Sequence, residues 1–254
     1  RQARADRGRA LIRTLRNPQR RPVGRLFRKA RDCARSAHRV PPQPPAIMYL
    51  PSHFAETHPD RLARLIREHP LGMLVTHGPD GLDADHIPFE FDPAAGAHGR
   101  LTAHVARANP LWQRCAGGAE VLVVFRGPDG YVSPNWYPSK HEAHRQVPTW
   151  NYEVVHAHGR LSVRDDERFV RGIVARLTRH HEAAEPQPWK MGDSAPAYID
   201  QMLRQIVGIE IEVSALVGKA KLSQNKEPRD RLGAAEALAQ RGHEALARAM
   251  REAG

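Results

Sequence analysis

The sequence predicts a mainly β fold decorated with helices, most simply a small antiparallel barrel. Six or seven short apolar segments have strand character, and turn sequences such as Gly78-Pro-Asp-Gly81 join neighbours into hairpins. These strands do not alternate regularly with helices, which argues against a doubly wound parallel sheet. The length of 254 residues suits one large domain or two small ones.

The strand predictions rest on alternating or β-branched apolar runs bounded by turns. Residues 120–125 contain a Val-Leu-Val-Val centre, which indicates burial on both faces. Ile209 and Ile211 alternate with glutamates, as in a half-buried strand. Pro128-Asp-Gly130 should turn the chain between two strands, and Gly159 should interrupt a long one. In chain order, the predicted strands are 71–77, 82–91, 101–106, 120–125, 131–133, 150–163 and 207–217.

The helix predictions rest on caps, first-turn prolines and apolar stripes. Pro59 suits the first turn of a helix that Pro70 ends, and Asn109-Pro110 suits the start of a short one. Phe169 and Ile173 belong to an apolar stripe at helical spacing. The predicted helices are 57–70, 109–115, 165–181, 197–203 and a terminal amphipathic helix over 228–250.

Charge divides the chain at residue 47. Residues 1–47 hold 14 of the 39 Lys+Arg and 2 of the 28 Asp+Glu, a net of +12, whereas the remainder holds 25 against 26, a net of −1. We therefore expect an Arg- and Pro-rich leader over 1–47 and a single domain with a C-terminal helix over 48–254. Because the domain is nearly neutral and has no convincing helix-turn-helix, its residues do not predict DNA binding.

Four interpretations of the leader remain open. It could be a disordered basic arm that touches nucleic acid, a transit peptide with Ser36 as its single serine, or an ordered helical extension. Alternatively, Met48 is the natural first residue and the leader is not native. We favour the last interpretation, because the composition changes at once after Pro41-Pro-Gln-Pro-Pro45.

Several kinds of site are not predicted. Cys33 and Cys115 form neither a metal-binding spacing nor a disulfide framework, and the histidines match no zinc signature. The sequence shows no glycine-rich phosphate loop, no catalytic triad and no identifiable acid or base. No apolar run is long enough to span a membrane, so we expect a cytoplasmic setting with reduced cysteines.

A first polar cluster occupies the predicted strand 101–106 and the turn after it. Thr102 and His104 share one face, and Arg107 with the amides that start the next helix could hold a phosphate. In the alternative, Arg107 pairs with a carboxylate and Asn109 only caps the helix. Spacing alone favours this structural alternative.

A second cluster is aromatic. Trp136, Tyr137, Trp150 and Tyr152 fall within 17 positions of a chain that is only 6% aromatic. Aromatic planes beside hydroxyl and amide side chains suit a flat heterocycle, which would stack on them and hydrogen-bond at its edge. An ordinary aromatic core remains the alternative.

A third cluster is Lys219-Ala-Lys-Leu-Ser-Gln-Asn-Lys226, which holds three cations, a hydroxyl and two amides in eight residues. Such a segment is a poor core strand, but it suits an edge that faces an anion. The alternative is a solvated, basic exit from a strand.

Five segments in a fixed order resemble the PaiB family of FMN-binding negative transcriptional regulators. The similarity runs from Met48 to near the C-terminus and excludes residues 1–47. The segments are Met48-Tyr-Leu-Pro-Ser-His-Phe54, His104-Val-Ala-Arg-Ala-Asn-Pro110, Val132-Ser-Pro-Asn-Trp-Tyr137, Val147-Pro-Thr-Trp-Asn-Tyr152 and Lys221-Leu-Ser-Gln-Asn-Lys226.

The resemblance implies a split β-barrel of the pyridoxamine-phosphate-oxidase-like flavoproteins. It also implies a homodimer that binds FMN in clefts at the subunit interface. By the same resemblance, Arg107 and Asn109 would contact the phosphate or ribityl chain, and Thr149, Trp150 and Asn151 would line the ring. The remaining expected cofactor residues are Thr102, His104, Tyr131, Ser133, Lys221, Ser223, Gln224, Asn225 and Lys226.

Three functions are consistent with these expectations. The resemblance implies an FMN-binding negative regulator of transcription. The wider superfamily favours an FMN-dependent oxidoreductase, such as a flavin or small-molecule reductase, whose redox chemistry would belong to the flavin. The third alternative is a dimeric binding module for another flat ligand.

Overall fold

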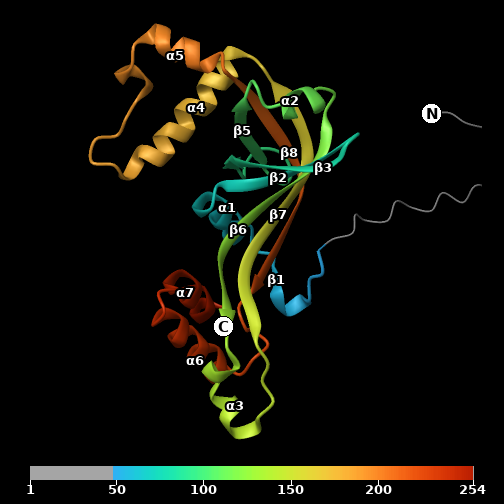
Figure 1. Cartoon of the computed structure of the whole chain (residues 1–254), viewed down its shortest axis with the longest axis vertical. Coiled ribbons are helices and arrows are strands. Elements are labelled where there is room, and N and C mark those ends of the chain that lie inside the picture. Colours follow the sequence, from blue (N-terminus) through green and yellow to red (C-terminus); the bar gives the residue numbers. More distant parts are fainter. Residues whose placement is uncertain (1–47, 254) are drawn as a thin grey trace, which may run out of the picture. The chain divides into compact units, whose positions relative to one another are not determined.

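The computed structural model describes residues 48–253, which form an antiparallel eight-stranded sheet with helices packed around it (Figure 1). The leader predictions concern residues outside this range. The strand order is β3-β2-β6-β7-β8-β5-β4, and β1 pairs with β8. The strands are β1 (Ala55–Glu56), β2 (Leu71–Gly78), β3 (Gly81–Pro88), β4 (Glu90–Asp92), β5 (Arg100–Ala106), β6 (Ala119–Val132), β7 (Thr149–Arg164) and β8 (Ile206–Lys221).

The helices pack against this sheet or extend beyond its ends. The helix α1 borders the sheet, α4 and α5 form an excursion between β7 and β8, and α6 and α7 follow β8. The helices are α1 (Pro59–Glu68), α2 (Leu111–Arg114), α3 (Pro138–Ala143), α4 (Glu167–His181), α5 (Pro196–Leu203), α6 (Pro228–Ala239) and α7 (Glu244–Glu252). Short 3-10 turns are η1 (Ser52–Phe54), η2 (Pro134–Trp136), η3 (Glu182–Ala184) and η4 (Met191–Asp193). None of the helices within 48–253 is long and apolar enough to cross a membrane.

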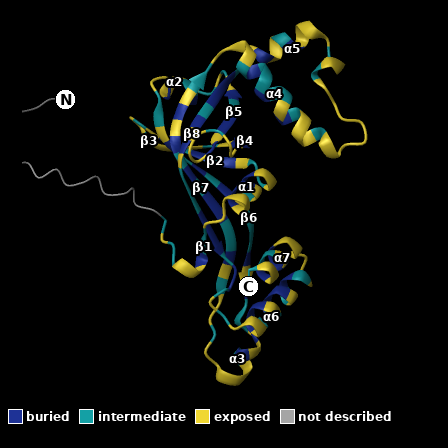
Figure 2. Ribbon diagram, turned by 180° about the vertical axis from the view of Figure 1, so that it is seen from behind, coloured by how far each residue is buried: buried dark blue, intermediate teal, exposed yellow. Residues whose placement is uncertain are grey.

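Two hydrophobic cores lie along the three long strands β6, β7 and β8. The larger core fills the barrel, where β2 pairs with β6 and β5 pairs with β8. The smaller core lies between the far ends of the long strands and the helices α6 and α7. Buried positions alternate along the strands with positions on the other face, as the period of two requires (Figure 2).

The sheet face opposite the barrel core, here called the outer face, is apolar but only half-buried. The strand registers place Met73, Val124, His156 and Val217 in one row across β2, β6, β7 and β8. All four residues are half-buried. The next row has the same character and comprises Val75, Leu122, His158 and Ala215.

Most predicted elements are confirmed, and four details differ. The strand β6 does not turn at 128–130 but continues to Val132 through a bulge after Arg126. The segment 82–91 is divided into β3 and β4. The segment 228–250 forms two helices, because Gly242 adopts a left-handed φ of +83° between them. Lys219 and Lys221 belong to β8 rather than to its exit, with Lys219 buried.

Gly159 marks a second bulge, where the register between β7 and β8 shifts. A β-carbon at this position would lie 2.4 Å from the Glu212 carbonyl oxygen and 2.7 Å from Ile211 Cγ2. Glycine is therefore needed here because the neighbouring backbone approaches too closely for any side chain. The interruption predicted at Gly159 is a bulge within one continuous strand.

Candidate functional site

Three lysines gather at the end of β8 and in the turn after it. Lys221 Nζ donates to the Trp150 carbonyl at 2.6 Å and to Thr149 Oγ1, while Lys219 Nζ donates to the Tyr49 carbonyl at 2.8 Å. Within 48–253, none of the three forms an ion pair with a carboxylate. Burial lowers the pKa of Lys221, and the charges of Lys219 and Lys226 lower it further. The cluster therefore has positive charge that lacks a counter-ion and would attract an anion.

Exposed aromatic rings adjoin these lysines. Tyr131 and Trp150 face each other across β6 and β7, with ring centres 6.4 Å apart, and are 46% and 56% exposed. Trp150 and Tyr152 also line a hollow of about 410 Å³, together with Val154, His156, Glu153 and the Arg126–Asp129 ion pair. Lys219 Nζ lies 5.6 Å from the centre of the Tyr152 ring. The lysines and the aromatic hollow are thus neighbours, which suits a flat anionic ligand.

A buried polar network holds the turn that carries the lysines. Asn151 is fully buried and donates from Nδ2 to Ser223 Oγ at 2.9 Å, and Tyr137 Oη lies 3.4 Å from the same hydroxyl. Ser223 adopts a φ of +66°, which is unfavourable for a residue with a β-carbon. Asn151 Oδ1 is buried and finds no partner within 48–253. The network fixes the direction in which the chain leaves β8.

Asp230 extends this network to Lys226. The Asp230 carboxylate accepts from Ser139 N at 2.9 Å, from Ser139 Oγ at 2.6 Å and from Gln146 Nε2 at 3.1 Å. Gln146 Oε1 in turn accepts from Lys226 Nζ at 2.7 Å. Because Asp230 is 1% exposed, these donors replace the water that its charge would otherwise hold.

Three further predicted residues at this end have local structural roles. Gln224 turns back on its own chain, since Oε1 accepts from Leu222 N at 2.8 Å and Nε2 donates to the Ala220 carbonyl at 2.6 Å. Ser133 caps η2 by accepting from Asn135 N. Asn225 is exposed. Gln224 and Ser133 thus shape the loops around the lysines and aromatic rings.

The residues predicted on β5 lie elsewhere. Ala106 pairs with Ile206 at the start of β8, whereas Lys221 ends the same strand 15 residues later. At about 3.3 Å per residue, that separation is roughly 50 Å, which no small ligand bridges. Within one chain, the structure therefore does not bring Thr102, His104, Arg107 and Asn109 to the lysine cluster.

Arg107 pairs with a carboxylate, as the structural alternative to a phosphate site predicted. Its guanidinium donates to both Asp165 oxygens, at 2.9 and 2.5 Å, and to the carbonyls of Arg204 and Ile206 at 2.7 and 3.1 Å. Asn109 Oδ1 accepts from the amide of Leu111, the first residue of α2, at 2.8 Å. These contacts tie the end of β5 to the segments flanking α4 and α5.

The other two residues of this first cluster, Thr102 and His104, also lie on β5 away from the lysine cluster. Thr102 Oγ1 donates to Glu90 at 3.2 Å. His104 Nδ1 is buried with no partner within 48–253, and burial lowers the pKa of this imidazole, so it is neutral at pH 7. Neither side chain presents charge for a phosphate.

We expect Arg107→Ala to reduce stability by about 1 kcal/mol and to leave FMN affinity unchanged. The loss is small because the Arg107–Asp165 pair is more than a third exposed, which weakens its contribution. Urea unfolding and FMN titration on the same preparation would measure both quantities. A Kd for FMN raised tenfold or more would return Arg107 to the cofactor site.

The sequence placed Lys219 and Tyr152 in the third and second clusters without a specific cofactor contact for either, and it predicted no site role for His156. Their positions on β7 and β8 provide the missing signal, because Lys219 and Lys221 are two residues apart and so share a face, as do Trp150, Tyr152 and His156. This shared orientation can be recognised only when the segments of Trp150–His156 and Lys219–Lys221 are both assigned to strands.

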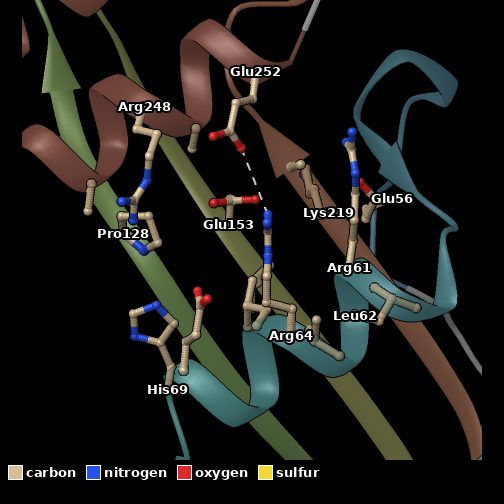
Figure 3. A pocket seen from close by; sticks show the side chains of 17 residues that line it. Glu56, Arg61, Leu62, Arg64, His69, Pro128, Glu153, Lys219, Arg248 and Glu252 are labelled. Atoms are coloured by element: carbon tan, nitrogen blue, oxygen red, sulfur yellow. Dashed lines mark hydrogen bonds and ion pairs between the residues drawn. The ribbon is translucent and has the colours of Figure 1, made fainter.

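A charged cleft lies between α1 and α7, beside β7 and β8 (Figure 3). It has a volume of about 320 Å³, and Glu153 projects into it from β7. Glu153 is half-buried and makes no hydrogen bond or ion pair within 48–253. Burial raises the pKa of the Glu153 carboxyl, an effect that the nearby charge of Arg64 partly offsets.

We expect Glu153→Gln to stabilise the protein at about pH 8 by about 1 kcal/mol and to have little effect at about pH 4. Because the folded-state pKa of Glu153 is raised, its ionisation destabilises the fold as pH rises through that pKa. Glu56 and Glu252 add to this effect, while Arg61 and Arg64 oppose it. Thermal melts of both proteins at the two pH values measure it, and an equal shift at both would contradict this account.

Comparison with known proteins assigns the family. A family model described as "Putative FMN-binding domain" matches residues 48–215. The Bacillus subtilis "Protease synthase and sporulation protein PAI 2" is 30% identical over 191 residues, which is 75% of this chain and 89% of that protein. The chain belongs to the family of FMN-binding domains that this model describes. The resemblance to the PaiB family and to FMN-binding proteins is thereby confirmed, and FMN is the cofactor.

Other relatives extend the comparison. An uncharacterized protein of Aspergillus fumigatus is 33% identical over 255 residues, covering 82% of this chain and 98% of that protein. The solved structure of the flavocytochrome Anf3 from Azotobacter vinelandii has a TM-score of 0.51 at 13% identity and covers 66% of this chain and 69% of that one. This structural likeness concerns the fold, which is the split β-barrel that the resemblance implied.

The residues at the end of β8 fit the chemistry of FMN. FMN offers an anionic phosphate, a polar ribityl chain and a flat ring. The three lysines have no carboxylate partner within 48–253, and Trp150 and Tyr152 offer apolar ring surfaces beside them. The hydroxyl of Thr149 lies between the two kinds of group, in contact with Lys221.

Proposed function

We propose that this PaiB-family protein binds FMN on the outer face at the end of β6, β7 and β8. Lys221, with Lys219 and Lys226 near it, attracts the phosphate, and Thr149 supplies a hydroxyl for the polar chain. Trp150 and Tyr152 hold the ring in the hollow that they line. The observation that supports this assignment most directly is that Lys219 and Lys221, which form no ion pair with a carboxylate within 48–253, lie beside Tyr152 and Trp150. Bound FMN supplies one- and two-electron redox chemistry.

The buried network of Asn151, Ser223 and Tyr137 supports the site without contacting the ligand. Asn151, Ser223 and Tyr137 do not face the hollow, since neighbouring residues on a strand point to opposite faces. They instead hold the turn after β8 in the conformation that places the lysines. Asn151 and Ser223 are therefore positioning residues in this proposal, as are Gln224 and Ser133.

The functional unit in this proposal is a homodimer. The outer face exposes two half-buried rows across four strands, each with three apolar residues and one histidine, which a second copy would cover. A second copy would also close the hollow at its open side. In this homodimer, Thr102, His104 and Asn109 would contact the FMN only if the second copy supplied them.

The biological role that we propose is negative regulation of transcription, as the PaiB family resemblance implies. Residues 48–254 have a net charge of −1 by composition, so the barrel carries no overall positive charge that would favour binding to DNA. Regulation would then depend on the state of the bound flavin rather than on direct recognition of an operator by the barrel.

An FMN-dependent oxidoreductase is the second candidate, and His156 favours it. His156 lines the hollow, and burial lowers the pKa of its imidazole, with further lowering by the charges of His158 and Lys219. A neutral imidazole beside the ring could accept a proton during a redox step. Glu153, whose carboxyl pKa is raised by burial, also lines the hollow and is a second candidate proton carrier.

Titration of the full chain with FMN tests the cofactor assignment. We expect a yellow protein, or quenching of FMN fluorescence by Trp150 on binding, and a dimer by light scattering. A colourless protein that does not change the FMN spectrum would refute both flavin functions. Rapid bleaching of the flavin by NADPH would favour the oxidoreductase.

A gel shift with promoter DNA, using the full chain and a chain that begins at Met48, tests the regulatory role. DNA binding that persists in the shorter chain would support recognition by the barrel. Binding that disappears with residues 1–47 would assign it to the basic leader.

A further inference from the structure

We propose that the cleft between α1 and α7 is a second ligand site, which takes a small molecule with a protonated amino group and holds that group over the Glu153 carboxylate. Glu153 also lines the hollow of the flavin proposal, and Lys219 also lines this cleft, but the amine would lie between α1 and α7, whereas the flavin ring would lie on Trp150 and Tyr152. Amine binding and FMN binding are measured separately, so either proposal can fail without the other.

The cleft has the size and construction of a small-molecule site. Its volume of about 320 Å³ falls in the range of ligand pockets. Glu153 and Ala220 belong to its sheet side, and α1 and α7 form its walls (Figure 3). A second hollow of about 270 Å³ shares Glu56, Glu153 and Ala220 with it, so the cleft is elongated.

The acidic and basic side chains around the cleft balance in number, so its preference depends on which of them lack a partner. Glu56, Glu68, Glu153 and Glu252 provide four carboxylates, and Arg61, Arg64 and Arg248 provide three guanidinium groups. The lysine that also lines the cleft, Lys219, directs its ammonium to the Tyr49 carbonyl.

Two of these carboxylates already have partners. Glu56 accepts from Arg61 at 3.2 Å and from His58 N at 2.8 Å, and Glu252 lies 4.0 Å from Arg64 (Figure 3). Glu153 has none within 48–253, although it is the carboxylate that projects from the sheet.

An amino group is the complement that Glu153 lacks. A half-buried carboxylate without a partner is unfavourable, and a protonated amine would give it a charge-assisted hydrogen bond. The raised pKa of Glu153 is consistent with a half-buried carboxylate that lacks a hydrogen-bond or ion-pair partner within 48–253. Arg248 lines the same cleft and forms no ion pair within 48–253, so it could receive a carboxylate of the same ligand. The amine could therefore belong to a simple amine or to an amino acid.

Binding of propylamine, alanine and propionate to the full chain at about pH 8 tests the proposal. We expect propylamine or alanine to bind and raise the melting temperature, and propionate to have no effect. Glu153→Gln should weaken amine binding at least tenfold, whereas the control Glu68→Gln, on α1 at the same cleft, should weaken it much less. An unchanged far-UV circular dichroism spectrum verifies that each variant is folded.

The outcomes separate the two ligand sources. Equal binding of propylamine and alanine assigns the site to simple amines. Preference for alanine that is lost in Arg248→Ala assigns it to amino acids. Binding of neither amine, or equal amine affinity in Glu153→Gln and the unmodified protein, would overturn the proposal, whatever the result of the FMN titration.

Discussion

Lys221→Ala is expected to weaken FMN binding by about 1.5–3 kcal/mol, or roughly 10- to 150-fold in Kd. Lys221 donates to Thr149 Oγ1 and to the Trp150 carbonyl, so its ammonium is held beside the aromatic hollow before any ligand arrives. Its depressed pKa shows that the unliganded site disfavours this charge. A bound phosphate would stabilise the charged form of Lys221, and this favourable interaction is lost when alanine replaces the lysine. Quenching of FMN fluorescence measures the change.

Lys190→Ala provides the matched control for this prediction. Lys190 is an exposed lysine in the excursion between β7 and β8 and lines neither the hollow nor the lysine cluster. Its loss should leave the Kd within a factor of about two. Lys221→Arg should retain more affinity than Lys221→Ala because it keeps the charge. Equal affinity for FMN in Lys221→Ala and the unmodified protein would remove Lys221 from the phosphate site.

Gly159→Ala is expected to destabilise the protein by about 3 kcal/mol or more, lowering the melting temperature by roughly 6–12 °C. The added methyl group would lie 2.4 Å from the Glu212 carbonyl oxygen and 2.7 Å from Ile211 Cγ2. The first of these atoms belongs to the backbone of β8, which cannot move without disturbing the pairing of β7 and β8. Differential scanning calorimetry measures the loss.

Gly117→Ala is the control for the bulge. A methyl group at Gly117 meets nothing within 4 Å, so its effect should stay within about 0.5 kcal/mol. If Gly159→Ala were as stable as this control, β8 would have to relax around the methyl group. The bulge would then not require glycine.

Much of the fold could be predicted because its signals are local. Alternation in 207–217 and the apolar run in 120–125 identify buried strands, and Asn109-Pro110 identifies the start of α2, although the residue at the N-cap is Pro110. The misassigned turn at 128–130 shows the limit of such signals. Pro128-Asp-Gly130 has turn composition, but pairing with β7 absorbs it as a bulge within β6.

The candidate site was less predictable because it depends on contacts between distant segments. Residue spacing favoured a structural role for Arg107 and Asn109, and the structure shows such roles. The family resemblance instead implied that both residues contact the cofactor. However, β5 pairs with the first half of β8, whereas Lys221 lies at the other end of that strand. Composition also could not distinguish Gln224, which binds its own backbone, from Lys221, which reaches Thr149.

The amino-acid sequence was sufficient to predict the antiparallel β class, most strand and helix positions, the contrast between residues 1–47 and the rest, and membership of an FMN-binding family. These properties depend on composition, periodicity and motifs, which are local along the chain. The three-dimensional structure was needed to show that Lys219, Lys221 and Trp150 adjoin one hollow and that Glu153 projects into the cleft between α1 and α7. Those relations arise from strand register and from the packing of α1 and α7, which bring together residues far apart in the chain.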